Sequence, residues 1–347
     1  MAGGIEWAAS AAFTEYLRAH VDGLEPAVAV NAFDGGQSNP TFRVTDAAGH
    51  QWVLRKKPEG ELLPSAHAVD REYRVMKALE GTDIPVPRMS CYCEDPSVIG
   101  TPFYVMEFVR GRILWDPALP RFEAVGRAAL YDDINRVIAA LHAISPASVG
   151  LADYGRPAQF FERQVARWTK QYRASATETI PSMDRLAEWL PAHIPAHASA
   201  SIFHGDLRLD NFIVHPTEPR VIAVLDWELS TLGEPLADIA HYALAWRLTS
   251  TEFRGMAEKA PLPAGIPAER EFLRRYLERM GRQADPRDYE FCVAYAMFRL
   301  AAILQGIVKR SLDGTASSAK ALETGLKARG IADAAWRSIR AHFDDAR

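Results

Sequence analysis

The apolar pattern changes once along the chain, and this change most constrains the fold. Before about residue 110 the chain holds short β-rich runs separated by turn residues, with helical stretches among them. After about residue 122 apolar residues recur mainly at helical spacing. The pattern predicts an α+β protein with a small β-rich lobe over residues 1–108 and a larger, mainly helical lobe over residues 109–347.

Individual elements can be predicted from the same spacing. In the first lobe we expect helices over residues 6–20 and 65–79, and strands over residues 26–33, 41–45, 51–55, 88–94 and 102–109. Residues 34–40 form a turn cluster of Gly, Asn, Pro and Ser. In the second lobe we expect helices over residues 124–144 and 157–172, a loop over 191–200, short strands over 201–226, and helices from about 235 onward.

Composition excludes several classes of protein. The 347 residues are 48% hydrophobic, which is too apolar for a disordered chain. The net charge is −4 and the pI about 6.2, which argues against a nucleic-acid partner bound by bulk charge. The cysteines Cys91, Cys93 and Cys292 cannot form a disulfide framework and are expected to be reduced.

Targeting segments are not visible in the sequence. The first residues lack the basic and apolar regions of a signal peptide. The apolar stretch over residues 291–308 is interrupted by Arg299 and Gln305, so it predicts a buried helix and no membrane span. We therefore expect a cytoplasmic protein with no membrane partner, and the sequence indicates no oligomeric state.

Glycine and histidine spacing excludes common enzyme motifs. No two of the 22 glycines are two or four residues apart, which excludes a dinucleotide-binding Gly-x-Gly-x-x-Gly and a Gly-x-Ser-x-Gly nucleophile elbow. No Walker A sequence is present. The pair His193 and His197 lacks the glutamate of a zinc-protease motif.

One short region concentrates the polar residues that could carry chemistry. The sequence His-Gly-Asp-Leu-Arg-Leu-Asp-Asn spans residues 204–211, and Asp226 ends an apolar run that begins at residue 221. A carboxylate at the end of a buried strand requires a cation or a hydrogen-bonding partner. Asn211 and Asp226 offer the oxygen ligands that Mg²⁺ prefers, and Asp206 could accept a proton from a hydroxyl.

This spacing resembles the kinase-like phosphotransferases. The form His-Gly-Asp-x-x-x-x-Asn, with Asp-Trp at residues 226–227, is similar to the branch of the aminoglycoside phosphotransferases and choline kinases. The resemblance implies a two-lobe protein-kinase-like fold that uses ATP and Mg²⁺. It implies Asp206 as catalytic base, Asn211 and Asp226 as metal ligands, and Asp238 as a support of the catalytic loop.

The same resemblance implies a nucleotide site in the first lobe. Its phosphate-covering loop would contain Gly35, Gly36, Ser38 and Asn39. A phosphate-binding cation is expected on the strand that holds Val53; Arg55 shares the face of Val53, whereas the adjacent Lys56 points to the other face if the strand is regular. The remaining implied residues are Glu72 as the ion-pair partner, Met106 at the adenine pocket, and the backbone groups of Glu107 and Val109.

Neighbouring residues have plainer interpretations. Arg208 could contact phosphate or pair locally within the catalytic loop. His204 is interpreted as ordering that loop, and His142 and His241 as structural. Trp168, Trp189 and Trp246 are expected in the core or the wall of a cleft.

The acceptor is constrained by charge and by a closer resemblance. Residues 250–347 carry 17 Lys+Arg and 13 Asp+Glu, a balance of +4 against −8 for residues 1–249. A basic region favours a neutral or anionic acceptor over a polycation, although an evenly solvated surface explains it equally well. Residues 53–58, 63–73 and 204–211 resemble the kinase domains fused to some acyl-CoA dehydrogenases.

These observations predict an enzyme that transfers the ATP γ-phosphoryl group to a hydroxyl of a small molecule, with a hydroxyacyl-CoA-like metabolite as one candidate acceptor. Alternatives are an aminoglycoside or amino-alcohol kinase and a non-catalytic nucleotide-binding regulator. A protein kinase is disfavoured because neither Asp-Phe-Gly nor Ala-Pro-Glu occurs.

Overall fold

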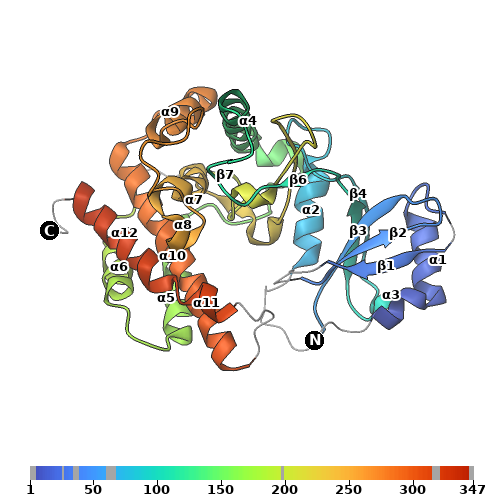
Figure 1. Cartoon of the computed structure of the whole chain (residues 1–347). Coiled ribbons are helices and arrows are strands. Elements are labelled where there is room, and N and C mark those ends of the chain that lie inside the picture. Colours follow the sequence, from blue (N-terminus) through green and yellow to red (C-terminus); the bar gives the residue numbers. More distant parts are fainter. Residues whose placement is uncertain are drawn as a thin grey trace. The chain divides into compact units, whose positions relative to one another are not determined.

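The chain divides into two compact units. The computed structural model describes residues 5–25, 27–33, 39–59, 68–196, 199–314 and 321–343. One unit comprises Met1–Gly111 together with Ile222–Leu229, and the other comprises Arg112–Val221 and Ser230–Arg347. The first is built on a β-sheet and the second is mainly helical (Figure 1), so the prediction of an α+β fold is confirmed. The segment that carries Asp226 belongs to the first unit.

The first unit contains a five-stranded antiparallel sheet with the order β1-β2-β3-β5-β4. Its strands are β1 (Ala29–Ala32), β2 (Thr41–Thr45), β3 (Gln51–Lys56), β4 (Met89–Cys93) and β5 (Phe103–Glu107). The sequence predicted all five, and β2 with the observed bounds. The other elements are the 3₁₀ helices η1 (Ile5–Ala9) and η4 (Trp227–Leu229), the strand segment β9 (Val221–Val224) leading into η4, and the helices α1 (Ala11–His20), α2 (Val69–Leu79) and α3 (Pro96–Ile99).

Strand alternation gives the sheet two different faces. One face packs Trp52 and Leu54 of β3 with Phe103 of β5 into a core completed by Phe13 of α1. Lys56 follows the same alternation, is buried, and its Nζ lies 5.5 Å from the ring centroid of Trp7. Arg55 therefore points to the opposite face. In the register of the sheet it pairs with Tyr104 of β5.

Helix α2 packs near β4 and β5. Its buried residues include Glu72, Val75 and Met76. The helix ends before Gly81, whose φ of +77° is readily adopted by glycine. The predicted start at residues 65–67 lies outside the described residues. The 3₁₀ helix η4 contacts α2, which brings residues 227–229 close to this helix.

The second unit contains two small antiparallel strand pairs and most of the helices. Strand β6 (Arg112–Ile113) pairs with β8 (Phe212–Val214), and β7 (Ser201–Phe203) pairs with β10 (Thr231–Gly233). Short 3₁₀ helices are η2 (Pro146–Val149) and η3 (Leu209–Asn211). The α-helices are α4 (Ala124–Ala143), α5 (Phe160–Ser175), α6 (Pro181–Ala192), α7 (Pro235–Arg247), α8 (Ser250–Phe253), α9 (Glu269–Met280), α10 (Pro286–Leu312), α11 (Ala321–Gly325) and α12 (Ala328–His342).

Helix α10 is the central element of this unit. It contacts α5, α6, α7, α11 and α12 (Figure 1). Among the described helices it alone is long and apolar enough to cross a bilayer, but 89% of its most apolar window is buried inside the structure. The predicted buried helix over residues 291–308 is therefore observed. Within it, the Gln305 amide donates to the Ser175 carbonyl at 3.0 Å, which satisfies a polar group in the core.

The core of the first unit yields a stability prediction. Phe103 is fully buried and makes edge contacts with Phe13 and Tyr16. Phe103→Ala should lower the free energy of unfolding by about 3–5 kcal/mol because it removes a buried ring and leaves a cavity. Urea unfolding followed by circular dichroism measures this loss. Phe33→Ala, at a residue that is 37% exposed, should cost less than about 1 kcal/mol. Equal losses in the two variants would contradict the described core.

Candidate active site

The predicted catalytic loop, residues 204–211 of the second unit, is held by one buried carboxylate. Asp238, on the first turn of α7, accepts the backbone N–H of His204 at 2.6 Å and that of Gly205 at 2.9 Å. Gly205 has φ +88°, which a side chain would strain. The same carboxylate contacts Nε2 of His142 at 3.2 Å. Two backbone donors and one imidazole thus fix the loop that follows β7.

Asp206 lies at the centre of this loop. Its own N–H donates to Nδ1 of His204 at 3.1 Å. The Asn211 amide nitrogen donates to its backbone carbonyl at 2.7 Å and to Oδ2 at 3.2 Å. Nη2 of Arg208 lies 3.0 Å from Oδ2, and Nε2 of His241 lies 3.2 Å from Oδ1. Both carboxylate oxygens therefore have hydrogen-bonding or ionic partners.

These partners set the ionisation of Asp206. Burial acts to raise the pKa of this carboxyl, but Arg208 and His241 outweigh burial and lower the pKa below its usual range. The pKa of His241 is lowered, mainly by burial, so its imidazole is neutral at pH 7. Since the ionised carboxylate can only accept, His241 must carry its proton on Nε2. The site thus presents an ionised carboxylate in a fixed orientation.

His241 is a residue whose role sequence reasoning missed. It was interpreted as structural, yet its imidazole contacts the predicted base. Its Nδ1 is buried and has no hydrogen-bond partner among the residues that the structure describes. The spacing was an available signal: His241 follows Asp238 by three residues, so both side chains lie on the loop-facing side of α7.

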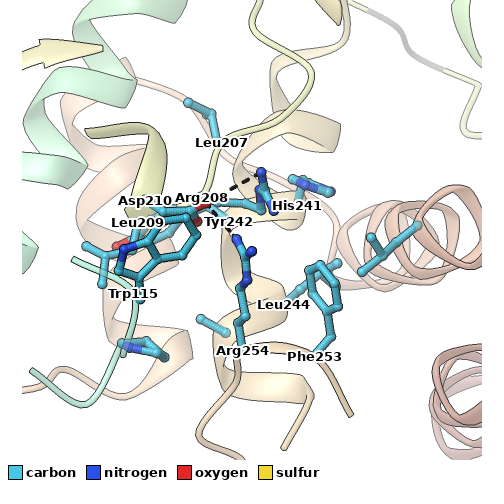
Figure 2. A pocket seen from close by; sticks show the side chains of 13 residues that line it. Trp115, Leu207, Arg208, Leu209, Asp210, His241, Tyr242, Leu244, Phe253 and Arg254 are labelled. Atoms are coloured by element: carbon cyan, nitrogen blue, oxygen red, sulfur yellow. Dashed lines mark hydrogen bonds and ion pairs between the residues drawn. The ribbon is translucent and has the colours of Figure 1, made fainter. Parts of the chain in front are cut away.

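A pocket within the second unit is lined in part by residues 207–210 of the predicted catalytic loop. It contains about 480 Å³ of empty space, including solvent at its mouth. Figure 2 shows Arg208 and Arg254 turned toward Asp210, with Nη atoms 3.6 and 2.6 Å from Oδ2 of that carboxylate. The guanidinium of Arg254 also lies 4.6 Å from the ring centroid of Trp115. Most other lining residues are apolar: Pro117, Leu207, Leu209, Tyr242, Leu244, Ala245, Phe253 and Leu300.

In the first unit, Arg55 and Glu72 form a buried ion pair. Nε of Arg55 lies 3.0 Å from Oε2 of Glu72. Glu72 also accepts from the Asn39 amide at 2.6 Å and from the Tyr104 hydroxyl at 3.0 Å. Burial raises the pKa of Glu72, and the guanidinium of Arg55 opposes this shift. Burial acts to lower the pKa of Arg55, but Glu72, Tyr104, Asp226 and Glu228 together outweigh burial and raise the pKa, so the guanidinium stays charged.

The same guanidinium contacts two further carboxylates. Nη2 of Arg55 lies 3.2 Å from Oδ1 of Asp226 and 3.3 Å from Oε2 of Glu228. Asp226 has φ +66°, an uncommon conformation for a residue other than glycine, which turns the chain between β9 and η4. Glu228 was not predicted, although its position two residues after Asp226 was a signal.

The remaining predicted nucleotide residues are placed as follows. Gly35, Gly36 and Ser38 lie outside the described residues. Val53 and Met106 are cross-strand partners and both are buried. Glu107 is exposed and its N–H donates to the Arg88 carbonyl, while Val109 is half-buried. Their roles toward a nucleotide stay predictions.

Two of the predicted site residues, Asn211 and Asp226, have side-chain oxygens that could bind Mg²⁺. No group of three or more His, Cys, Asp or Glu side chains in the described part of the chain could hold a metal ion by itself. Asn211 uses its amide nitrogen toward Asp206, which leaves the amide oxygen as its metal-binding atom. Asn211 in the second unit and Asp226 in the first each offer an oxygen of the kind that Mg²⁺ binds, and their predicted role as metal ligands stays a prediction.

Asp238 yields a prediction on acid stability. Burial would raise its pKa, but the hydrogen bonds from His142 and His204 outweigh burial and lower the pKa. A depressed folded-state pKa means that the ionised carboxylate stabilises the fold above about pH 4 and that this stability is lost as pH falls through the folded pKa. Asp238→Asn should cost about 3–5 kcal/mol at pH 7 and flatten the acid limb of the stability curve.

Urea unfolding between pH 3 and pH 7 measures both effects. The control is Asp132→Asn, because the side chain of Asp132 is 46% exposed and pairs with the partly exposed Arg279. Parallel pH profiles for the wild type and Asp238→Asn would contradict the role given to Asp238.

Similarity to known proteins agrees with this geometry. Residues 29–276 match the profile of the phosphotransferase enzyme family. A crystal structure of a candidate aminoglycoside phosphotransferase from Ralstonia eutropha JMP134 is 49% identical, covers 95% of this chain and 98% of that one, and has a TM-score of 0.86. Spectinomycin phosphotransferase, crystallised with ADP and spectinomycin, is 11% identical with a TM-score of 0.61, over 94% of this chain and 97% of that one, and shares the fold.

A curated relative links the chain to larger proteins. Acyl-CoA dehydrogenase family member 10 of Mus musculus is 48% identical over 307 residues, which are 88% of this chain. The chain spans 28% of the length of that mouse protein. The match of the family profile extends over most of the sequence, and the solved relative matches over nearly its whole length. The chain therefore belongs to the phosphotransferase enzyme family and has its kinase-like α+β fold.

Proposed function

We propose that the protein is an ATP-dependent kinase that phosphorylates a hydroxyl group of a small molecule. The observation that carries the proposal is the environment of Asp206: an ionised carboxylate held by Arg208, Asn211 and His241 in a loop fixed by Asp238. Family membership supports phosphoryl transfer, and the ADP in the spectinomycin phosphotransferase structure supports the use of a nucleotide.

In this proposal Asp206 orients the acceptor and takes its proton. The acceptor oxygen forms a bond to the γ-phosphorus while the bond from that phosphorus to the β–γ bridging oxygen breaks, and ADP leaves with the electron pair. The hydroxyl proton passes to Asp206. A carboxylate with a lowered pKa is a weak base, which suits a loose transition state in which the proton transfers late. Positioning of the hydroxyl is then the larger contribution.

The first unit supplies the nucleotide contacts in this proposal. Arg55 takes the place of the usual phosphate-binding lysine, and Glu72 holds its guanidinium. Asp226 and Asn211 hold Mg²⁺, which neutralises phosphate charge when bound. The three carboxylates around Arg55 keep it charged and oriented toward the side of the sheet that also carries Val53 and Met106. The loop of Gly35, Gly36, Ser38 and Asn39 is proposed to cover the phosphates.

The pocket bears on the acceptor. Of the residues that line it, Asp210 alone carries a carboxylate, and both Arg208 and Arg254 contact that carboxylate. A polycationic aminoglycoside would need several available carboxylates. The apolar lining instead suits an acceptor with a hydrocarbon part. Together with the similarity to acyl-CoA dehydrogenase family member 10, this favours a hydroxyacyl-CoA-like metabolite. The solved relative from Ralstonia eutropha keeps an aminoglycoside or amino alcohol as the second candidate.

A screen of acceptors tests the proposal. Purified protein is incubated with Mg·ATP and a panel of hydroxyacyl-CoAs, aminoglycosides and amino alcohols, and products gaining one phosphate are sought by mass spectrometry. Phosphorylation of a hydroxyacyl-CoA is the expected result. Nucleotide binding without any turnover across the panel would favour the non-catalytic regulator.

Asp206→Asn is expected to lower kcat by about 10²–10⁴-fold, because the amide keeps the shape but cannot accept the proton. Binding of Mg·ATP, measured by calorimetry, should stay within about threefold of the wild type, because Asp206 does not bind the nucleotide in this proposal. Asp132→Asn on α4 is the matched control, with unchanged kcat. Near-normal turnover in Asp206→Asn would remove this residue from the role of base.

Asp226→Ala should have a different signature. Loss of a metal ligand is expected to weaken Mg²⁺-dependent nucleotide binding by at least about tenfold, while binding in EDTA changes little. Titration of a fluorescent ATP analogue at several Mg²⁺ concentrations measures this. An unchanged dependence on Mg²⁺ would exclude Asp226 as a ligand.

A further inference from the structure

Two arginines lie against one tryptophan in the second unit. Arg167 and Trp168 are on α5, and Arg299 is on α10, the helix that packs beside α5. The guanidinium carbon of Arg167 lies 5.2 Å from the ring centroid of Trp168, and that of Arg299 lies 5.5 Å from the same centroid. Both distances are within the range of cation–π contacts. Two like charges are thus held around one ring.

Neither arginine has a carboxylate partner in the described part of the chain. No Asp or Glu oxygen there lies within the 4.0 Å ion-pair distance of either guanidinium. Arg299 is only 3% exposed. Two less buried arginines differ, since Arg55 contacts three carboxylates and Arg247 lies 2.5 Å from Glu269 and 2.7 Å from Glu290. A buried guanidinium that forms no ion pair at contact distance is costly to desolvate, and an anion bound from outside would lower that cost.

The charge of Arg299 affects the ionisation of residues at the proposed active site. Arg299 contributes to lowering the pKa of Asp206 and of His241. Arg167 is exposed as a whole residue, but partial desolvation of its guanidinium and repulsion from Arg299 lower its pKa. Arg299 is therefore close enough to the proposed base to interact with it, whereas the repulsion between Arg299 and Arg167 is not relieved by any carboxylate within 4.0 Å of either guanidinium in the described residues. An anion bound there would relieve that repulsion.

We propose that Arg299 and Arg167 form, beside Trp168, a binding site for an anionic group, carboxylate or phosphate, that is carried by the acceptor substrate. This inference rests on the proposed function and narrows its acceptor class. Arg299 supplies a desolvated guanidinium, for which two parallel hydrogen bonds to a carboxylate or phosphate are the favoured geometry. Arg167 is exposed at the surface of α5 and adds a second charge.

We assign the anionic group at Arg299 to the acceptor and not to the nucleotide. Arg55 of the first unit already has the position expected for the nucleotide phosphates, next to Asp226. In the pocket, Arg254 pairs with Asp210, and Arg208 pairs with both Asp210 and Asp206, so two carboxylates already balance these two guanidinium groups. An acceptor bound through Arg299 would carry a hydroxyl at one end and an anion at the other, which disfavours a polycationic aminoglycoside.

Binding of inorganic phosphate tests the site without catalysis. Phosphate is titrated at constant ionic strength and followed by ³¹P line broadening, in the wild type, Arg299→Met and Arg167→Met. Loss of a charge-assisted contact should weaken binding by about tenfold or more in Arg299→Met, and by less in Arg167→Met. Arg287→Met is the matched control, because Arg287 is on the same helix and lies 5.5 Å from an aromatic ring, that of Phe343. Absence of phosphate binding by the wild type, or equal affinity in Arg299→Met, would overturn the proposal.

Folding of the variants is checked by thermal unfolding. If Arg299→Met does not fold, Arg299→Lys keeps the charge but loses the paired donors, and Arg167→Met changes an exposed residue. Reduced phosphate binding by both folded variants supports the site, and unchanged binding by both overturns it.

Turnover distinguishes an acceptor-borne anion from free phosphate. Three probes share one chain and differ at one end: 6-hydroxyhexanoate, 6-hydroxyhexyl phosphate and 6-hydroxyhexanamide. Arg299→Met should raise KM for the carboxylate or phosphate probe by about tenfold and leave the neutral amide within twofold. Equal changes for all three, or phosphate competing with ATP instead of the acceptor, would overturn the acceptor assignment. If no acceptor is phosphorylated while phosphate binding still requires Arg299, the kinase proposal fails and the anion site stands.

Discussion

The geometry of the site depends on the carboxylate of Asp238. It accepts two consecutive backbone N–H groups, from His204 and Gly205, at a position where the chain must take a left-handed turn. Without that acceptor, two buried donors would be orphaned and the loop would lose its conformation. Asp238 is on the first turn of α7, so the helix that fixes the loop also carries His241 to the carboxylate of Asp206. One short helical segment thus sets both the path of the backbone and the orientation of the base.

In the first unit, the alternation of side chains along β3 places two adjacent cations, Arg55 and Lys56, on opposite faces of the sheet. Lys56 is directed toward Trp7 and the core side of the sheet, where its ammonium group pairs with Glu59. Arg55 points to the other face and gathers Glu72, Asp226 and Glu228. The two residues have similar charge, but the period of two in a strand gives them different surroundings. Arginine suits this place because its planar group can contact several carboxylates at once.

Much of this could be predicted from the sequence, and the failures have physical causes. Strand β2 and the α4 region were predicted closely because their periodicity extends without interruption. Helix α6 was missed, since no element was predicted for residues 173–190 and residues 191–200 were predicted as a loop; Pro181 lies in the first turn of this helix, where proline is tolerated. The grouping of Arg55 with Glu228 joins residues 173 positions apart, and no local pattern encodes it. The contact of His241 with Asp206 could have been predicted from the spacing of His241 to Asp238. The proposed role of Arg299 could not, because it depends on the absence of carboxylates around that side chain in the described part of the fold.

Arg299 differs from the other arginines of the site in that it is buried and forms no ion pair with a described carboxylate. A partly buried guanidinium with carboxylate partners, such as that of Arg247, is explained by the ion pairs that it forms. The buried guanidinium of Arg299, stacked on the indole of Trp168 beside a second arginine, has no such explanation. The energy of this stacking is small compared with the cost of desolvating a charge that forms no ion pair. Retaining such a charge near Asp206 also weakens that carboxylate as a base. An arginine at this position therefore has two disadvantages, the desolvation of its charge and the lower basicity of Asp206. An anion bound to Arg299 would offset the first, and because it would screen the charge of Arg299, it would also raise the basicity of Asp206 when the acceptor is bound.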